Sequence, residues 1–301
     1  MNKRVLITGS TGFTGRYIAA EMHSAGYEVY GLMHRLPERK IPDLTAAHVC
    51  DLGDRLGLKR IAEEVRPDYV MHLAGIAFVE HGDMDAIYRT NVVGTRNLIE
   101  AVANSGYKPQ SVLLASSANI YGNATVEPID ETTPAAPAND YAVSKLAMEY
   151  MARLWFDQLP ITLVRPFNYT GAGQSLDFLL PKIVDHFKRR AAVLELGNLD
   201  VVRDFSDVRS VVKRYRLLVE SGISGEAFNI CSGQGHSLRE VLQLMRDLTG
   251  HNPEIRVNPA FVRANEVHRL IGSPAKLDAA IGVVPNIPLR DTLQWMLETA
   301  D

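Results

Sequence analysis

The chain has 301 residues, of which 46% are hydrophobic and 22% are charged, and its formal net charge is −3. This composition is ordinary for a folded globular protein, and the mixed charges give no broad basic field that would favour nucleic acid or an anionic membrane as a partner. Apolar stretches are too short for a bilayer span or a signal peptide, so we expect a cytoplasmic protein. The two cysteines, Cys50 and Cys231, stand alone and are expected to be buried, with no disulfide or metal site.

Short apolar runs alternate with amphipathic stretches through the first half of the chain. Strands are predicted at residues 4–8, 28–33, 69–73, 111–116 and 161–165. Helices are predicted at residues 14–25, 56–65, 85–105 and 140–156, and Gly26 and Gly106 are placed to end two of them. This alternation predicts an α/β protein with a Rossmann-type, doubly wound parallel sheet.

The rhythm changes after residue 165, where prolines and glycines interrupt the chain. Further helices are predicted at residues 182–190, 208–220, 238–249 and 289–298, separated by short strands. We therefore expect a first domain at 1–166 and a smaller, interlocked C-terminal α/β domain at 167–301. A later segment, at roughly 200–225, is expected to return to the first domain. Without a flexible linker, the two domains should pack closely and leave a cleft.

A glycine-rich turn follows the first predicted strand directly and leads into a helix. Glycines at this place let the backbone turn sharply and approach a pyrophosphate, whose charge the helix amino terminus stabilises. A tight turn with close helix packing would need the same glycines, but the strand before and the helix after favour a dinucleotide site. The turn residues expected to contact the cofactor are Thr8, Gly9, Thr11, Gly12, Phe13, Thr14 and Gly15.

The end of the second predicted strand bears on the choice of cofactor. An acidic residue there would bind the ribose of NAD, but the sequence reads Met33-His34-Arg35. Arg35, with His34 or Arg39, could instead pair with a 2'-phosphate. We therefore expect a preference for NADP(H), with NAD(H) still possible; the other interpretation is a solvated loop.

Tyr141 and Lys145 are four residues apart in a predicted helix, which places both side chains on one face. A nearby ammonium lowers the pKa of a phenol toward the working range, so Tyr141 could exchange a proton. Reduction of a ketone requires such a proton at oxygen together with a hydride at carbon. Ser117, just beyond a strand, could donate a second hydrogen bond to the substrate oxygen.

In combination, these motifs resemble the extended short-chain dehydrogenase family. The matching segments, in family order, are Gly9-x-x-Gly12-x-x-Gly15, His72-Leu73-Ala74-Gly75, Asn91-Val92-Val93-Gly94-Thr95, Ser116-Ser117-Ala118-Asn119-Ile120-Tyr121-Gly122, Tyr141-x-x-x-Lys145 and Arg165-Pro166-Phe167-Asn168. The resemblance implies that Tyr141 is the proton donor, that Lys145 binds the nicotinamide ribose, and that Ser117 orients the substrate. It also implies cofactor contacts at Asp51, Leu52, Leu73, Ala74, Gly75, Tyr141, Lys145 and Pro166.

Two other polar residues, Asn91 and His72, are expected to have structural roles. The resemblance implies that Asn91 distorts its helix. His72 is expected to end a buried strand rather than to act as a catalytic base.

The second half resembles a narrower group, the GDP-mannose 4,6-dehydratases and GDP-4-keto-6-deoxymannose reductases. The segments that carry this are 171–176, 197–205, 228–233 and 263–267. Arg203 and Arg263 could neutralise a diphosphate, and Glu266 could accept hydrogen bonds from ribose or guanine. The segment 178–183 resembles the one whose lysine meets the nucleotide base, here Lys182. The alternative is that these charged side chains form ordinary surface ion pairs, and it is strongest for Lys182. The expected substrate contacts are Phe78, Ser117, Ala118, Asn119, Tyr141, Asn168, Phe178, Lys182, Arg203, Arg263 and Glu266.

The dehydratase and the reductase differ beside the catalytic serine. Dehydratases carry a glutamate base two residues after it, and here Asn119 takes that place. We therefore expect reduction of the C4 ketone of a GDP-linked 4-keto-6-deoxy sugar, giving GDP-D-rhamnose, unless Glu80 or His81 supplies the acid from another loop. The segment 75–91 is shorter than in the reductases, which leaves the C4 stereochemistry open. A tryptophan is missing after Gly282, a change expected to affect packing only.

Two other functions remain open at this point. A nucleotide-sugar 4-epimerase would use the same tyrosine and lysine with tightly bound NAD, and a non-catalytic regulator would keep the fold only to sense NAD(P). The resemblance also implies a homodimer, built from the helices at 85–105 and 140–156 as a four-helix bundle. A higher oligomer is left open.

Overall fold

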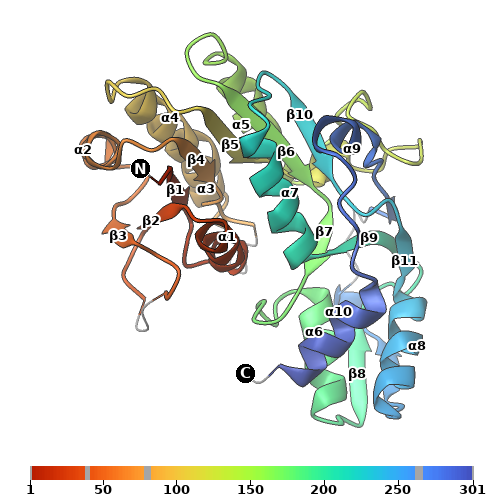
Figure 1. Cartoon of the computed structure of the whole chain (residues 1–301). Coiled ribbons are helices and arrows are strands. Elements are labelled where there is room, and N and C mark those ends of the chain that lie inside the picture. The colour runs from red at the N-terminus through yellow and green to blue at the C-terminus, as the bar shows by residue number, and fades with distance from the viewer. Residues whose placement is uncertain (1, 38–40, 78–82, 262–266, 300–301) are drawn as a thin grey trace.

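A seven-stranded parallel sheet forms the centre of the larger part of the molecule (Figure 1). The computed structural model describes residues 2–37, 41–77, 83–261 and 267–299. The strand order is β3-β2-β1-β4-β5-β6-β10, and each neighbouring pair is parallel. The strands are β1 (Arg4–Thr8), β2 (Glu28–Met33), β3 (Ala46–Val49), β4 (Tyr69–His72), β5 (Ser111–Ala115), β6 (Ile161–Pro166) and β10 (Ala227–Ile230).

The central strands are apolar because helices cover both faces of the sheet. Val5, Leu6 and Ile7 of β1 are all at most 1% exposed, although their side chains alternate between the faces. One face is covered by α1 (Phe13–Ser24), α7 (Val208–Glu220) and α9 (Ala275–Ile281). The other face is covered by α2 (Arg55–Val65), α4 (Thr95–Ala103) and α5 (Asp140–Arg153). The expected doubly wound α/β fold is therefore confirmed.

The smaller part of the molecule has its own apolar core. Three helices enclose it, namely α6 (Leu179–Lys188), α8 (Leu238–Thr249) and α10 (Leu289–Glu298). Helix α8 begins at a capping box formed by Ser237 and Glu240 and ends at Gly250, whose φ is +63°. The small strands are β7 (Asn168–Thr170), β8 (Val193–Leu196), β9 (Val202–Asp207), β11 (Gly235–Ser237), β12 (Glu254–Val257) and β13 (Arg269–Leu270).

The chain crosses between the two parts more than once. After β9, which pairs with β7, β11 and β13 in the smaller part, helix α7 packs in the core of the large sheet. Strand β10 then pairs with β6 at the edge of that sheet. The chain thus returns to the larger part at α7 and stays there through β10. Strand β9, which precedes α7, belongs to the smaller part.

Two elements differ from the sequence-based expectation. The edge strand β3 was not predicted, because it has only four residues and two of them are exposed. The helix expected at 85–105 is divided into α3 (Met84–Tyr88), a π-helical turn (Arg89–Gly94) and α4. Asn91 lies in that turn. Its side-chain oxygen accepts a hydrogen bond from the Ile76 nitrogen, and its side-chain nitrogen donates to the Ile76 carbonyl and to the Ser144 hydroxyl. The expected distortion at Asn91 is confirmed.

No helix among the described ranges is both long enough and apolar enough to cross a membrane. Both cysteines are buried, as expected.

Candidate active site

The glycine-rich turn lies between β1 and α1, pressed against the segment that follows β4. Gly9 has a φ of +71°, and a Cβ there would lie 2.8 Å from the backbone nitrogen of Ala74. A Cβ on Gly15 would lie 2.1 Å from the Gly9 carbonyl oxygen. Only glycine therefore allows this close approach of turn, helix and strand end.

The amino terminus of α1 fits the pyrophosphate of a dinucleotide. No side chain caps it at Gly12, and its first turn contains no acidic residue. A Cβ on Gly12 would come within 3.2 Å of the Gly9 carbonyl, so its absence keeps the turn open above the helix end. The first-turn amides and the positive helix end can thus hold an anion at this place.

The other expected cofactor residues lie along neighbouring strand ends. The Thr8 hydroxyl accepts from the Ala74 nitrogen at 3.2 Å, which places Leu73 and Ala74 beside the turn. Pro166 ends β6. Gly75 leaves room for Lys145, because a Cβ there would lie 3.1 Å from the lysine Nζ.

The adenosine end of the expected site is formed by the segments after β2 and β3. Arg35 is exposed just beyond β2. Asp51 accepts from the Gly53 nitrogen at 2.7 Å and faces His34 at 3.6 Å. The carbonyl of Leu52 is held by the Asn97 amide at 2.9 Å. None of the four described residues directly after β2, which read His34-Arg35-Leu36-Pro37, is acidic.

Helix α5 carries the expected proton donor. Asn139 caps this helix by accepting from the Ala142 nitrogen at 2.9 Å, and Tyr141 and Lys145 follow in its first two turns. The Lys145 Nζ donates to the Ala115 carbonyl at the end of β5, at 2.8 Å, and lies 6.0 Å from the Tyr141 ring centroid. The helix face that bears both residues is thereby fixed to the edge of the sheet.

Ser117 joins the same cluster through a chain of hydrogen bonds. Its Oγ accepts from the backbone nitrogen of Asn119 at 3.2 Å and from the Asn119 side-chain amide at 3.0 Å. With two donors directed at this oxygen, the serine hydroxyl is free to donate to Tyr141, and this hydrogen bond lowers the pKa of the phenol. The order of donation is therefore Asn119, Ser117, Tyr141.

The expected lowering of the Tyr141 pKa is wrong for this structure. Burial raises the pKa of Tyr141 to about 12, and the hydrogen bond from Ser117 only partly offsets this. The reason is that Lys145 is itself buried, with a pKa lowered to about 8, and donates to a carbonyl instead of the phenol. The phenol is consequently held protonated at neutral pH, the form that can donate a proton.

His72 has a structural role, as expected. It ends β4 and is 1% exposed, with Nδ1 at 2.6 Å from the Thr8 hydroxyl and Nε2 at 2.8 Å from the Thr95 hydroxyl. Burial and the nearby Lys145 lower its pKa to about 3, so the ring stays neutral.

Two of the expected substrate residues lie on paired strands of the smaller part. Asn168 is exposed on β7, opposite Phe205 of β9, and Arg203 stands two residues earlier on β9. The Arg203 guanidinium donates to the carbonyls of Val202, Val267 and His268. Arg203 is thus directed at the backbone just after residue 266.

A second group lies at the start of α6. Phe178 precedes the helix and is 41% exposed, and the Lys182 Nζ lies 4.4 Å from the Phe261 ring centroid. Ala118 is buried beside Ser117. Phe78, Arg263 and Glu266 lie outside the described residues, as do Arg39, Glu80 and His81.

Tyr169 was missed by the sequence analysis. Its hydroxyl lies 2.7 Å from the Thr14 hydroxyl, and its ring stacks on Phe13 with centroids 6.2 Å apart. Arg16 and Tyr17 of α1 also donate to the carbonyls of Gly173 and Ala172. An aromatic residue directly after Asn168 was the only signal in the sequence. These contacts join the glycine-rich turn and α1 to β7 and the segment that follows it.

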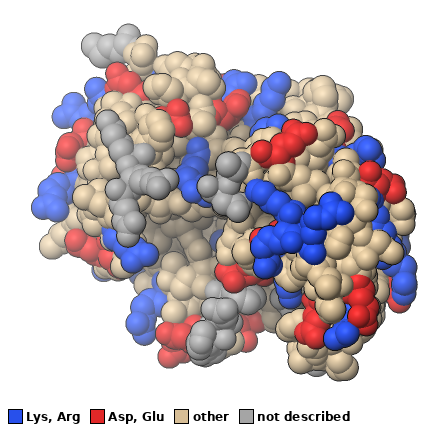
Figure 2. All heavy atoms as spheres, turned by 90° about the horizontal axis from the view of Figure 1, so that it is seen from below, with Lys and Arg blue, Asp and Glu red and all other residues tan. Residues whose placement is uncertain are grey.

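Figure 2 shows a hollow in the face of the molecule seen from below, with Lys and Arg side chains gathered beside it. Over the described ranges, no cluster of three or more His, Cys, Asp or Glu side chains is placed to hold a metal ion.

Comparison with known sequences gives full-length matches. The profile of the GDP-mannose 4,6 dehydratase family matches residues 6–296. The GDP-6-deoxy-D-talose 4-dehydrogenase of Aggregatibacter actinomycetemcomitans is 33% identical over 93% of this chain and 91% of its own length. The GDP-6-deoxy-D-mannose reductase of Pseudomonas aeruginosa is 33% identical over 99% of this chain and 97% of its own.

Solved structures have the same fold. A Burkholderia cenocepacia protein, provisionally assigned as an epimerase, is 48% identical with a TM-score of 0.93, covering 98% and 97% of the two chains. The RMD protein of Pseudomonas aeruginosa in complex with NADPH is 32% identical with a TM-score of 0.84, covering 98% of each chain. A Thermus thermophilus UDP-glucose 4-epimerase in complex with NAD is 29% identical with a TM-score of 0.85, also covering 98% of each chain.

The contact between Gly15 and Gly9 generates a prediction about the turn. Replacing Gly15 with alanine places a methyl group against backbone that cannot move aside, so we expect the free energy of unfolding to fall by about 1–3 kcal/mol and NADPH affinity to fall at least tenfold. Fluorescence titration and thermal unfolding measure the two effects. Gly106→Ala, in the segment after α4, is the control for a loss of stability alone: its φ of +73° strains an alanine there, so stability should also fall, but NADPH affinity should not. Unchanged NADPH affinity in Gly15→Ala would show that the turn does not hold the cofactor.

Proposed function

The chain belongs to the GDP-mannose 4,6-dehydratase family of extended short-chain dehydrogenases, and we propose that it is an NADPH-dependent 4-keto reductase of a GDP-linked sugar. The substrate proposed is GDP-4-keto-6-deoxy-D-mannose and the product GDP-D-rhamnose. In this proposal the larger part, with α7, holds the cofactor, and the smaller part holds the nucleotide sugar.

One observation carries the proposal: the residue that points at Ser117 is an amide. The Asn119 side chain donates to the Ser117 Oγ at 3.0 Å, and an amide has no pKa that would let it remove a proton at neutral pH. A dehydratase needs such a base for carbon 5. Asn119 instead supports reduction, because it orients the serine proton toward Tyr141.

The geometry of this cluster supports proton transfer to a ketone oxygen. When bound, NADPH would supply the hydride that adds to carbon 4. Tyr141 donates its phenolic proton to the oxygen of the same carbonyl. The single Ser117 proton, directed at Tyr141 in the substrate-free structure, turns to this oxygen when the substrate binds and stabilises the developing negative charge. The buried ammonium of Lys145, 6.0 Å from the Tyr141 ring centroid, favours the phenolate that forms. The residues that would hold the cofactor are the glycine-rich turn, Ala74, Gly75, Pro166 and Lys145.

The nucleotide end of the substrate is assigned to the smaller part. We propose that the Arg203 guanidinium, which donates to three backbone carbonyls in this structure, turns to pair with the diphosphate when the substrate binds. In the same proposal Lys182 contacts the base, and Phe178, Ala118 and Asn168 line the path to the sugar. Similar proteins named for GDP-linked 6-deoxy sugars support guanine as the base. Arg263, Glu266 and Phe78, expected from the sequence to contribute, remain predictions.

The reaction is tested with NADPH and GDP-4-keto-6-deoxymannose, which a dehydratase generates from GDP-mannose. We expect NADPH oxidation with formation of a GDP-6-deoxyhexose, and a loss of about 10²- to 10⁴-fold in kcat for Tyr141→Phe. Tyr107→Phe is the control, because this residue lies on the surface beside Asp68. Absence of NADPH oxidation by the wild-type protein would contradict the reductase assignment.

A preference for NADPH is expected from the position of Arg35. Arg35→Ala should weaken NADPH binding by about tenfold, because a charge-assisted hydrogen bond to the 2'-phosphate is lost, and should leave NADH binding unchanged. Fluorescence titration of both cofactors measures this, with Arg60→Ala on α2 as the control. Equal losses for NADPH and NADH would mean that Arg35 does not contact the 2'-phosphate.

We also propose a homodimer formed through α4 and α5. Val143, Tyr150 and Leu154 follow one face of α5 at helical spacing, and Tyr150 and Leu154 are 62% and 77% exposed. Leu154→Asp should therefore shift the protein from dimer to monomer at micromolar concentration in light scattering. Leu56→Asp, at an equally exposed leucine on α2, should not. A wild-type monomer would refute the dimer.

A nucleotide-sugar 4-epimerase is the second candidate, favoured by the likeness to two structures described as epimerases. An epimerase must retain its cofactor between turnovers. Purified protein carrying one tightly bound NAD per chain would favour this function over the reductase.

A further inference from the structure

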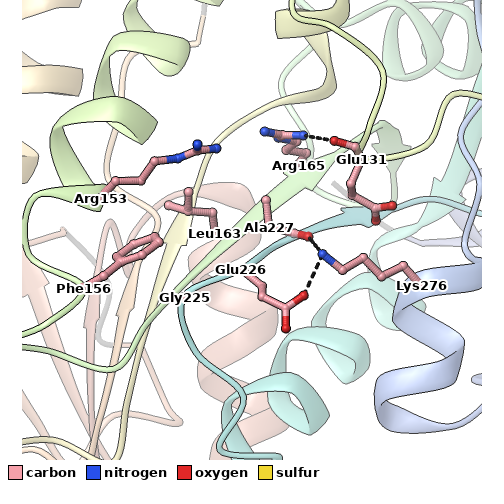
Figure 3. Close-up of a pocket in the computed structure, with 9 residues that line it drawn as sticks. All are labelled: Glu131, Arg153, Phe156, Leu163, Arg165, Gly225, Glu226, Ala227 and Lys276. Atoms are coloured by element: carbon pink, nitrogen blue, oxygen red, sulfur yellow. Dashed lines mark hydrogen bonds and ion pairs between the residues drawn. The ribbon is translucent and has the colours of Figure 1, made fainter.

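A buried ion pair lies behind the catalytic residues. Glu149 is 0% exposed and Arg165 is 6% exposed. The Arg165 Nε donates to Glu149 Oε1 at 2.9 Å and its Nη2 donates to Oε2 at 2.7 Å, so the pair is bidentate. Figure 3 shows Arg165 in the wall of a cavity of about 450 Å³, which Arg153, Glu131, Glu226 and Lys276 also line.

Glu149 shares a helix face with the expected catalytic residues. Tyr141, Lys145 and Glu149 follow one another at intervals of four residues on α5. Lys145 is therefore flanked on its own helix by the phenol on one side and by a buried carboxylate on the other. The carboxylate raises the pKa of Lys145, against the larger lowering that burial causes.

Arg165 connects this helix to the segment that carries Ser117. Its Nη1 donates to the Tyr121 hydroxyl at 2.8 Å, and the Tyr121 hydroxyl donates to Asn229 Oδ1 on β10 at 2.8 Å. Tyr121 ends the 3₁₀-helix Ala118–Tyr121, which begins directly after Ser117. A single guanidinium thus links α5, the serine segment and the edge of the sheet.

We propose that Glu149 is a positioning residue of the reaction: its carboxylate is the counter-charge of the Lys145 ammonium, and through Arg165 and Tyr121 it fixes the catalytic helix relative to Ser117. The proposal rests on the reductase or epimerase chemistry proposed above, since both use Tyr141 and Lys145. Glu149 itself touches neither substrate nor cofactor.

Three titratable groups of the described chain face Lys145. His72 faces it from β4 and stays neutral, and Tyr141 and Glu149 face it from α5. Behind Glu149 lie Arg165 at 2.7 Å and Arg153 at 4.0 Å. Glu149 is therefore the acidic group closest to Lys145 on its own helix, and removing it would leave Lys145 near unbalanced positive charge.

This arrangement predicts a graded effect on the pH at which Lys145 loses its proton. In Glu149→Gln the carboxylate is lost while the Arg165 charge remains, so Lys145 should deprotonate at a pH lower by about one unit. In the double variant Glu149→Leu with Arg165→Met both charges are lost, so the shift should be smaller but in the same direction. The double variant also leaves no unpaired buried charge, and so should fold even where the single variant does not.

The experiment measures NADPH affinity by fluorescence between pH 6 and pH 10, and in parallel the pH profile of kcat in the assay described above. The expected result is an alkaline loss of NADPH affinity whose midpoint moves down by about one unit in Glu149→Gln and by less in the double variant. Glu149→Asp keeps the charge and should keep the wild-type midpoint. Glu226→Gln is the matched control, because Glu226 lines the same cavity but pairs with Lys276.

Each result separates the inference from the proposed function. NADPH binding does not depend on the identity of the sugar, so a failed sugar assay leaves the binding midpoints interpretable. A folded Glu149→Gln or double variant with the wild-type midpoint would overturn the inference. A uniform loss of kcat at every pH, without a shift of the midpoint, would also overturn it, because it would show only a structural role.

Discussion

The bidentate contact between Arg165 and Glu149 is the interaction on which the candidate active site depends. Three elements that are far apart in the sequence meet there: the helix with Tyr141 and Lys145, the segment with Ser117, and the edge strand β10. Removing one partner of a buried pair costs about 3–5 kcal/mol, which is a large part of the 5–15 kcal/mol that stabilises a typical domain. The pair therefore constrains the geometry of the cluster more than any exposed ion pair of the chain could.

The site is also fixed from the side of the cofactor. The glycine-rich turn cannot move away from Ala74 or from α1 without a change of backbone, because its glycines are in direct contact with main-chain atoms. Thr14 and Phe13 then join the turn to Tyr169 on the substrate side. The larger and smaller parts are thus held together by short contacts instead of by a flexible linker, which would suit the proposed reaction, in which hydride and proton must reach neighbouring atoms.

The polar residues near the site divide into those that can exchange protons and those that hold the backbone. Asn91 and His72 are fully engaged in hydrogen bonds to neighbouring elements and are buried, so they support the frame. The phenol of Tyr141 is held protonated by burial and accepts a hydrogen bond from Ser117. Burial, rather than a direct contact with Lys145, therefore determines the direction in which the pKa of this phenol moves.

The sequence alone determined the doubly wound fold, many element boundaries and the placement of Tyr141 and Lys145 on one helix face, because these depend on local periodicity and on spacings within one helix or turn. Helices α7, α8 and α10 begin and end where the apolar pattern predicts. The tertiary structure decided what depends on contacts between distant segments: the edge strand β3, the π-helical turn at Asn91, the role of Tyr169 and the pairing of Glu149 with Arg165. It also decided the direction of the Tyr141 pKa shift, because the cost of burying a charge depends on everything packed around it and not on the spacing to one lysine.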